Sequence, residues 1–556
     1  MPLSSDGLSE WHGDDGPPAL IDTTIGDLFD AAAARAPHRQ ALVVDGFADL
    51  GFDISWTYEQ LQQRVNTMAR ALMADGVCAG DRVALWAPNV GQWIAIELAV
   101  AKVGAVLVPL NPTYRAAEAA YILSDTGATV IFLQPQLRQF GIAAQYRQAA
   151  IELPHLRAVS LAPADDLETL EAYLTRAPET AEPALADRQA QVSTHDPAQI
   201  HYTSGTTGVP KGAVLTHHSL INDARLFADR WQVSAEDRWA NPMPLFHTAG
   251  CAMVTLACIA TTATHCLAVW FDPDRIQTMI ARQRCTILET VPTMVTAILN
   301  RHPHEPVDLS SLRLIGTGGA PVTPELGRRV RAELGTELRS VYGLTETSPL
   351  VGAARLDAPG ETGWTTAGPP LPHTEVRVVA DETGKPVPLG DLGELHVRGY
   401  LVMSGYLNRA EATAATIDGD GWLRTGDIAR LTVDGDIQIV DRIKDMIIRG
   451  GENLYPAEIE AVIGRHPAVL ESCVVGVPDD YYGEEAFAVV RLRASEAISA
   501  EGLRDFMRTR VTHQKVPRYV RFVDRFPTTG SGKIRKRDVA EECARLLAGI
   551  DAPNPH

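Results

Sequence analysis

The chain has few features of a secreted, membrane-spanning or nucleic-acid-binding protein. Its seven cysteines are odd in number and scattered, and none lies in a Cys-x-x-Cys pair, which argues against a disulfide framework or a cysteine-ligated zinc site. The first residues lack both a basic start and an apolar core, so we expect no secretory leader. The stretch 251–270 has no Asp, Glu, Lys or Arg, but it holds four threonines and His265. This composition favours a buried helix and a buried strand over a membrane span.

Positive charge is also scarce. The 50 Lys and Arg residues face 69 Asp and Glu residues, which gives a formal net charge of −19. Such a charge disfavours binding to nucleic acids and anionic membranes. We therefore expect no nucleic-acid partner and a cytoplasmic protein, whose oligomeric state stays open. A polyanionic ligand would have to be held by local cations and backbone N–H groups.

What the sequence does contain is an alternation of short apolar runs and amphipathic segments. Its 556 residues exceed what one compact core normally organises, so two or more domains are expected. The alternation predicts parallel sheets covered by helices. Strands are predicted at 41–44, 82–86, 105–110 and 129–133, and helices at 90–103 and 116–124.

A change in composition near Asp434 predicts a domain junction. The charged stretch Asp441-Arg442-Ile443-Lys444-Asp445 lies between two apolar runs, as domain linkers often do. Beyond it, the pattern predicts strand, helix, strand, strand and helix at 446–448, 457–463, 472–477, 486–492 and 500–510. We predict a flexible N-terminus at 1–20, a large domain at 21–442, a small domain at 443–548 and a tail at 549–556.

The strongest local motif is the glycine- and hydroxyl-rich segment from Tyr202 to Gly212, YTSGTTGVPKG. It follows a predicted strand at 199–202 and precedes a helix predicted from near His217. Glycines allow tight turns, and clustered hydroxyl and N–H groups can cradle phosphate oxygens. The mononucleotide pattern GxxxxGK[ST] is not satisfied. A flexible surface loop is the alternative interpretation.

This segment resembles the phosphate-binding signature of the adenylate-forming enzymes, which include acyl- and aryl-CoA synthetases, luciferases and peptide-synthetase adenylation domains. Further segments are similar to the other family signatures, in the same order along the chain, from about residue 25 to residue 545. The resemblance implies that the nucleotide is bound by Thr203, Ser204, Gly205, Thr206, Thr207, Gly208, Lys211, Gly318, Gly319, Ala320, Pro321, Tyr342, Gly343, Asp427 and Arg442.

Within that set, the resemblance implies individual roles. Tyr342 would stack on the adenine, Thr345 would contact the α-phosphate, and Glu346 would hold Mg²⁺, a cation that prefers carboxylate oxygens. The Asp427 carboxylate would accept hydrogen bonds from both ribose hydroxyls. Without the family, Tyr342 would be a core aromatic residue and the Thr-Gly-Asp around Asp427 a simple turn.

The last signature, Pro527 to Ile534, contains Lys533. In the family this lysine bridges the acid and the α-phosphate during adenylation, where a cation stabilises two anions that approach each other. A basic surface tail is the alternative, since Arg535, Lys536 and Arg537 follow. The resemblance also implies that Lys444 is the interdomain hinge and that Gly450 and Gly451 line the thiol path. Arg449 departs from the small hydroxyl residue often found there.

The acid site is predicted from two more segments. Pro244 to Gly250 resembles the segment that borders the acyl group, with His247 near the carboxylate, although a lone histidine is usually structural. Val341 precedes the motif tyrosine, where relatives often have glycine, so we expect a shorter or narrower pocket. The predicted pocket residues are His247, Val291, Pro292, Gly318 and Val341.

The resemblance implies an α/β fold with a large N-terminal domain of layered α/β subdomains plus a small β-barrel, and a small mobile α+β C-terminal domain. It implies an ATP-dependent ligase that activates a carboxylic acid as its acyl-adenylate and transfers the acyl group to coenzyme A, with Mg²⁺. The alternatives are transfer to the phosphopantetheine of an acyl carrier protein, catalysis of only one half-reaction, a luciferase-type reaction, or nucleotide sensing without catalysis. A medium- or long-chain fatty acid is the first prediction for the substrate, and aryl or natural-product acids follow.

Overall fold

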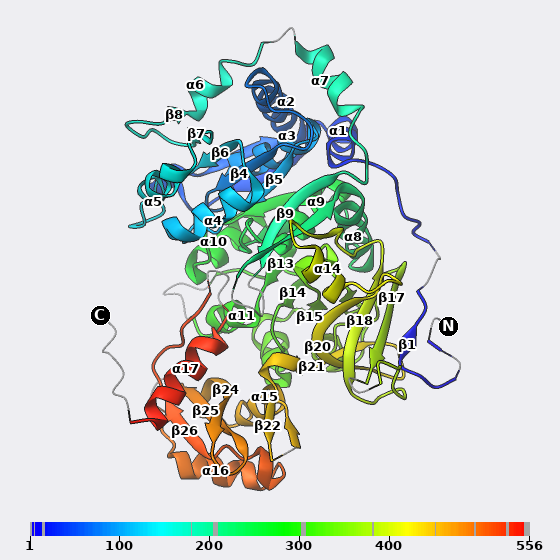
Figure 1. Ribbon diagram of the computed structural model, residues 1–556, viewed down its shortest axis with the longest axis vertical. Helices are drawn as coiled ribbons and strands as arrows, with labels where there is room; N and C mark the ends of the chain where they lie inside the picture. Colours follow the sequence, from blue (N-terminus) through cyan, green and yellow to red (C-terminus); the bar gives the residue numbers. More distant parts are fainter. Residues whose placement is uncertain are drawn as a thin grey trace.

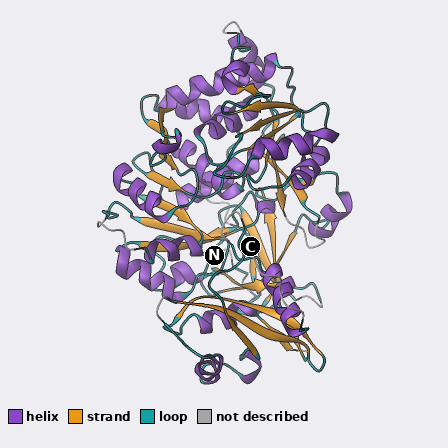
Figure 2. Ribbon diagram, turned by 90° about the vertical axis from the view of Figure 1, so that its left-hand side faces the viewer, coloured by secondary structure: helices purple, strands orange, loops and turns teal. Residues whose placement is uncertain are grey.

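The computed structural model is elongated and describes residues 3–4, 6–13, 17–178, 181–203, 209–301, 307–380, 383–450, 452–493, 496–529 and 533–549. Two large sheets occupy one part of the molecule, and a third sheet lies beside them (Figure 1). The segment from Ile447 onward forms a separate α/β layer at the far end (Figures 1 and 2). The predicted α/β class is confirmed. The predicted domain boundaries remain predictions.

The first large sheet carries the phosphate-loop segment at its edge. Its strand order is β19-β10-β9-β5-β4-β6-β7-β8. The strands from β9 to β8 in this order run parallel, whereas β10 pairs antiparallel with both β9 and β19. The bounds are β4 Arg82–Trp86, β5 Val106–Pro109, β6 Val130–Leu133, β7 Arg157–Ser160, β8 Glu168–Thr169, β9 Pro197–Thr203, β10 Lys211–Thr216 and β19 Gly405–Tyr406.

The second large sheet carries Gly318, Val341 and Tyr342, which are predicted to contact the nucleotide or the acid. Its order is β16-β15-β14-β13-β11-β12-β2-β3, parallel in the middle and antiparallel at both edges. The bounds are β2 Gln40–Val44, β3 Ile54–Thr57, β11 Arg238–Asn241, β12 Thr264–Leu267, β13 Ile287–Thr290, β14 Leu314–Gly318, β15 Glu337–Tyr342 and β16 Gly352–Ala353.

One hydrophobic core joins the two large sheets. It contains Val83 and Leu85 of β4 together with Leu288 of β13 and Leu314 of β14. Helix α3, Gly91–Lys102, is buried almost all round, as expected for a helix enclosed between layers. The other helices of this part are α1 Ile25–Arg35, α2 Tyr58–Ala74, α4 Ala116–Thr126, α5 Ile142–Ala149, α6 Leu170–Leu174, α7 Glu182–Gln189, α8 His217–Arg230, α9 Thr255–Thr261, α10 Pro273–Gln283, α11 Pro292–Leu299, α12 Pro324–Arg329 and α13 Thr362–Thr365.

The strands of the predicted small barrel form a five-stranded antiparallel sheet in the order β1-β17-β18-β20-β21. They have a core of their own. Strand β1 lies within the stretch predicted to be a flexible terminus, and it is held because the Trp11 ring is buried over Gly435. The bounds are β1 Glu10–Trp11, β17 Thr374–Val379, β18 Gly393–Gly399, β20 Leu423–Leu431 and β21 Ile437–Arg442, with helix α14 Ala410–Thr416 alongside.

The C-terminal layer is built on a sheet of order β23-β22-β25-β24, with β26 beside β25. Its strands and helices enclose two further clusters of buried side chains. The sequence pattern did not predict β23, β26 or α17. The bounds are β22 Ile447–Arg449, β23 Glu452–Leu454, α15 Pro456–Ile463, β24 Val469–Asp479, β25 Gly483–Leu492, α16 Ala500–Arg508, β26 Tyr519–Phe522 and α17 Lys536–Leu547.

The uncharged stretch 251–270 is confirmed as a buried helix followed by a buried strand. It contains most of the π-helix η4, Ala249–Val254, then α9 and β12. Among the residues that the structure describes, no helix is both long and apolar enough to cross a membrane.

Candidate active site

The phosphate-loop segment lies between β9 and β10, which form a hairpin. Thr203, the last residue of β9, pairs with Lys211, the first residue of β10. These two residues therefore frame the loop from both sides. The predicted phosphate ligands Ser204, Gly205, Thr206, Thr207 and Gly208 lie outside the described residues.

Glu346 lies next to this hairpin, in the short helix η6 (Thr345–Thr347) that follows β15. Its Oε1 atom accepts hydrogen bonds from the Thr203 hydroxyl at 3.2 Å and from the Tyr406 hydroxyl at 2.8 Å. The Lys211 ammonium lies 5.1 Å from the centre of the Tyr406 ring, within reach of a cation–π contact. Within the described part of the chain, the second carboxylate oxygen of Glu346 accepts no hydrogen bond.

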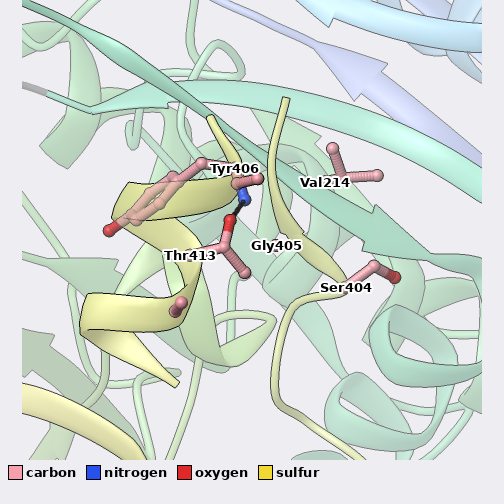
Figure 3. Close-up of a pocket in the computed structure, with 7 residues that line it drawn as sticks. Val214, Ser404, Gly405, Tyr406 and Thr413 are labelled. Carbon is pink, nitrogen blue, oxygen red and sulfur yellow. Dashed lines mark hydrogen bonds between the residues drawn. The ribbon is translucent and has the colours of Figure 1, made fainter. Parts of the chain in front are cut away.

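Tyr406 was not predicted from the sequence. It belongs to β19, a two-residue strand that pairs with β10. Tyr406 also lines a surface pocket, together with Val214, Ser404, Gly405 and Thr413 among others. In Figure 3 its ring points away from Val214 and Ser404, and the backbone N–H of Tyr406 donates to Thr413 Oγ1 at 2.9 Å. The hydroxyl of Tyr406 is directed to Glu346.

A second group joins Tyr342, Asp427 and Arg442. Tyr342 ends β15, and its hydroxyl donates a 2.7 Å hydrogen bond to Asp427 Oδ2. Arg442 Nε lies 2.8 Å from Asp427 Oδ1. Burial raises the pKa of the Asp427 carboxyl, and the positive charge of Arg442 acts in the opposite direction. The carboxylate keeps lone pairs that can accept further hydroxyl donors.

Close contacts or backbone conformation require glycine at three of the predicted nucleotide-binding positions, Gly318, Gly319 and Gly343. A Cβ on Gly318, at the end of β14, would lie 2.7 Å from Val341 Cγ2, and one on Gly343 would lie 1.8 Å from the Pro349 carbonyl oxygen. Gly319 has a left-handed φ of +76°, which a side chain rarely tolerates. Beyond β14, the residues Gly319, Ala320 and Pro321 are exposed at the site.

Lys533 reaches this edge from the C-terminal layer. A Cβ on Gly319 would lie 2.6 Å from Lys533 Nζ. The Lys533 backbone N–H donates to Thr529 Oγ1 at 3.1 Å, and the Thr529 N–H donates to the Lys533 carbonyl at 2.7 Å. Loss of water around the ammonium lowers the pKa of Lys533, the positive charge of Arg442 lowers it further, and Asp427 raises it.

His247 lies within electrostatic range of Lys533. Burial lowers the pKa of His247 to about 3, and the Lys533 charge adds to this effect, so the imidazole is neutral at pH 7. The His247 carbonyl accepts hydrogen bonds from the N–H groups of Gly250 and Cys251. A Cβ on Gly250 would lie 2.4 Å from the Pro244 carbonyl oxygen. The segment is therefore a tight turn that leads into η4.

The predicted pocket residue Val291 is buried in a small apolar cluster with Met243 and Met294. Pro292 is the first residue of α11, a position that suits proline because its missing N–H is not needed there. Val341 is 8% exposed and covers Gly318. A Cβ on Gly319 would lie 3.9 Å from Val291 Cγ1, so Val291 and Val341 both lie beside the end of β14.

Deeper along the same face lie two residues that sequence reasoning missed, Glu289 and Trp231. Glu289 on β13 pairs in register with Gly316 on β14. A Cβ on Gly316 would lie 2.5 Å from Glu289 Oε2 and 2.6 Å from Trp231 Cη2, so both side chains close over this glycine. Burial raises the pKa of Glu289 to about 8, and its Oε2 atom has no hydrogen-bond partner among the described residues. The carboxyl is therefore neutral at pH 7.

The predicted hinge and thiol loop lie between the third sheet and the C-terminal layer. Lys444 is exposed in the short helix η7, Ile443–Asp445, directly after Arg442. Gly450 has a φ of +60°, and its N–H donates to the Tyr482 carbonyl at 2.8 Å. Gly451 lies outside the described residues. Arg449 forms an ion pair with the buried Glu485 at 2.8 Å, so its guanidinium is held within the C-terminal layer.

The structure thus brings Thr203, Lys211 and Glu346 together on one side, and Tyr342, Asp427 and Arg442 on another. Lys533 lies against Gly319 between the second group and His247. Thr345 is half-buried beside Glu346, and its side chain makes no hydrogen bond with any described residue. Tyr406, Glu289 and Trp231 carry no local signature, since strand register and close packing bring them to the site.

Known proteins are similar to this chain over nearly its whole length. A model of the AMP-binding enzyme family matches residues 29–407, and a model of the AMP-binding enzyme C-terminal domain matches residues 458–533. A mouse mitochondrial medium-chain acyl-CoA ligase, ACSF2, is 37% identical to the chain over 570 residues, which cover 98% of this chain and 91% of the mouse protein.

Solved structures show the same likeness. An anthranilate CoA ligase, AuaEII, in complex with anthranoyl-AMP has a TM-score of 0.84 at 26% identity, covering 95% of this chain and 98% of its own. ATP-bound MatB from Rhodopseudomonas palustris has a TM-score of 0.79 at 29% identity, covering 94% of this chain and 100% of its own.

Proposed function

This chain belongs to the AMP-binding enzyme family and is an AMP-forming acyl-CoA ligase, and we propose that it joins its acid to the nucleotide at Lys533. One observation carries this proposal. The ammonium of Lys533 comes from the C-terminal layer and lies against Gly319, between the Tyr342–Asp427 pair and His247. A single cation therefore lies between the proposed nucleotide side and the proposed acid side.

The nucleotide would lie across the ends of β14 and β15. The Tyr342 ring and the exposed residues after Gly318 would contact the adenine, and Asp427 would accept the ribose hydroxyls. Arg442 would hold the Asp427 carboxylate ionised through their 2.8 Å ion pair. Thr203 and Lys211, which frame the phosphate loop, would contact the β- and γ-phosphates.

In the first half-reaction, a carboxylate oxygen of the acid attacks the α-phosphorus. The bond from that phosphorus to the bridging oxygen breaks, and pyrophosphate leaves. Negative charge builds on the α-phosphate while a second anion approaches it. Lys533 would stabilise this charge, and the Thr345 hydroxyl would donate a hydrogen bond to the same phosphate. The neutral His247 adds no competing positive charge on the acid side.

Glu346 fits a Mg²⁺ ion shared with the nucleotide. One of its oxygens is fixed by the hydroxyls of Thr203 and Tyr406, which leaves the other oxygen for a hard cation. When bound, the ion would neutralise phosphate charge. The chain's own contribution is to orient the carboxylate beside the phosphate loop.

In the second half-reaction, the thiolate of coenzyme A attacks the acyl carbon of the adenylate, and AMP leaves. Withdrawal of Lys533 would make room for the thiol, and we propose that the C-terminal layer rotates about Lys444 to do this. Gly450, in its left-handed conformation, would then face the site. An acyl carrier protein would present the same thiol on phosphopantetheine, so it is the alternative acceptor.

The acid would be of medium length or carry an aryl ring. This proposal rests on Trp231 and Glu289, which close over Gly316 and limit the depth behind Gly318. The wall of Val291, Met294 and Val341 is apolar. At the far end, the neutral Glu289 carboxyl could hydrogen-bond to a polar group on the acid. We also propose a cytoplasmic location, because the described cysteines are all free thiols.

The test is a panel of fatty and aryl acids incubated with the protein, Mg²⁺ and ATP, with and without coenzyme A. We expect AMP and pyrophosphate with the accepted acids, and an acyl-CoA product by mass spectrometry when coenzyme A is present. If AMP forms but no thioester appears with coenzyme A, the carrier-protein alternative gains support. If no acid gives AMP, the proposed reaction is wrong.

A further inference from the structure

Outside the active site, the side chains of Asp22, His195 and His218 gather in one place. One carboxylate oxygen and one ring nitrogen from each histidine all lie within 4.8 Å of one another. The two imidazole centres are 5.1 Å apart. The residues come from three segments that are distant in sequence, so the fold itself brings them together.

Backbone and neighbouring groups hold these side chains in place. The His218 N–H donates to the Thr194 carbonyl at 2.8 Å, and the Thr194 hydroxyl donates to the Asp22 carboxylate. Asn222 binds the backbone of Ile21, accepting from its N–H at 2.8 Å. Within the described part of the chain, the His195 ring and Nε2 of His218 have no hydrogen-bond partner. Hydrogen bonds therefore position Asp22 and His218 without using these nitrogens.

The cluster lies at the base of the hairpin that carries the phosphate loop. Strands β9 and β10 pair from Thr203 and Lys211 beside the loop to Pro197 and Thr216 at the other end. His195 comes two residues before β9, and His218 comes two residues after β10. At ~3.3 Å per residue, β9 alone spans about 20 Å, so the cluster lies at least this far from the loop along the strands. A ligand bound there would hold the hairpin without touching the reacting groups.

We propose that Asp22, His195 and His218 bind one divalent transition-metal ion of the zinc type, which ties the segment before α1 to the base of this hairpin. Two imidazoles and one carboxylate suit Zn²⁺, which commonly takes three protein ligands and a water molecule. Asp22 and His195 are exposed, so water can complete the coordination.

The distance of the cluster from the reacting groups predicts a role for the ion in stabilising the fold and not in catalysis.

The test uses the full chain without an affinity tag and without nucleotide, titrated with ZnCl₂ in a calorimeter. The parent protein carries Cys78→Ser, because Cys78 is an exposed free thiol that can bind zinc by itself. We expect about one ion per chain, and we expect Asp22→Asn and His195→Ala each to raise the Kd at least about tenfold. Both side chains are exposed, so the variants should fold, and circular dichroism checks this. His155→Ala, at an exposed histidine elsewhere, should leave the Kd unchanged.

Hydrogen exchange gives a second readout. Zinc should slow amide exchange in residues 17–24 of the parent protein and should have no such effect in Asp22→Asn. Absence of saturable binding overturns the proposal. So does binding that neither Asp22→Asn nor His195→Ala weakens, or exchange in residues 17–24 that zinc does not change.

Discussion

The hydroxyl of Tyr406 donates a 2.8 Å hydrogen bond to Oε1 of Glu346, the residue that we propose as the magnesium ligand. The bond joins the edge of the first large sheet to the helix that follows β15 in the second. It fixes the rotation of the Glu346 carboxylate before any nucleotide binds. Tyr406 therefore acts on the proposed metal site through Glu346.

Removal of this hydroxyl should weaken the use of Mg-ATP more than the use of the acid. For Tyr406→Phe we expect kcat/KM for ATP to fall about tenfold, because a hydrogen bond to a charged group is worth ~1.5–3 kcal/mol. A larger effect at low Mg²⁺ would point to the metal. Tyr481→Phe is the control, since Tyr481 is 85% exposed. Equal rates for the Tyr406→Phe variant and the parent would show that the bond has no role in catalysis.

Lys533 should matter for one half-reaction only. In Lys533→Ala we expect the rate of adenylation, measured as pyrophosphate release, to fall at least about 100-fold, because a cation aimed at the developing charge is lost. Thioester formation from supplied acyl-adenylate and coenzyme A should change little, because that step does not use the ammonium. Lys385→Ala, at an exposed lysine in the third sheet region, should leave both steps intact. Equal loss of both steps would contradict the proposed alternation of the C-terminal layer.

The sequence could predict the residues whose chemistry is carried by a local motif. Lys533, Glu346, Asp427 and Arg442 each stand in a short signature. The structure pairs Asp427 with Arg442 and brings Lys533 near them, and it sets Glu346 beside Thr203; the roles of these residues stay predictions. The strand patterns also predicted β4, β5, β6 and β9 of the first large sheet, but only β2 and β12 of the second. These predictions depend on local order along the chain, which a sequence displays directly.

Other parts of the site depend on register and packing, which local order does not display. Tyr406 reaches Glu346 only because a two-residue strand pairs with β10. Glu289 meets Trp231 because Gly316 in the neighbouring strand leaves space for both. Helix α17 was also missed. Its first residues, Lys536-Arg537-Asp538, are charged, and only Val539 and Cys543 are fully buried.

The contribution of Glu289 to the stability of the protein should fall as the pH rises through the range in which Glu289 ionises. Burial raises the pKa of Glu289 to about 8 in the folded protein, from 4.5 when exposed. At this site the folded state therefore binds more protons than the unfolded state between these values, so the Glu289 contribution is greatest below pH 4.5 and declines towards pH 8. At ~1.4 kcal/mol per pKa unit, this decline is at most on the order of 5 kcal/mol.

Glu289→Gln keeps the shape of the side chain and removes the titration. In denaturant unfolding at pH 5.5, 7 and 8.5, the difference in unfolding free energy between the parent protein and Glu289→Gln should therefore shift in favour of Glu289→Gln as the pH rises. Glu361→Gln, at an exposed carboxyl, should retain the parent's dependence. Parallel pH profiles for Glu289→Gln and the parent would mean that the carboxyl is not held neutral by burial.

The depth of the acid pocket should respond to a single methyl group at Gly316. In Gly316→Ala the new Cβ would lie 2.5 Å from Glu289 Oε2 and 2.6 Å from Trp231 Cη2, so both side chains must move. Their displacement should narrow the space where we place the end of the acid. We expect kcat/KM to fall at least about tenfold more for the longest accepted acid than for the shortest, because ~1.4 kcal/mol of lost packing is enough. The substitution should also cost about 1–3 kcal/mol of stability.

Gly419→Ala is the matched control, since a Cβ there meets nothing within 4 Å. Comparing acids within one variant separates the two effects, because loss of folded protein lowers all rates by the same factor. A uniform decrease across the panel would mean that the acid ends before Gly316.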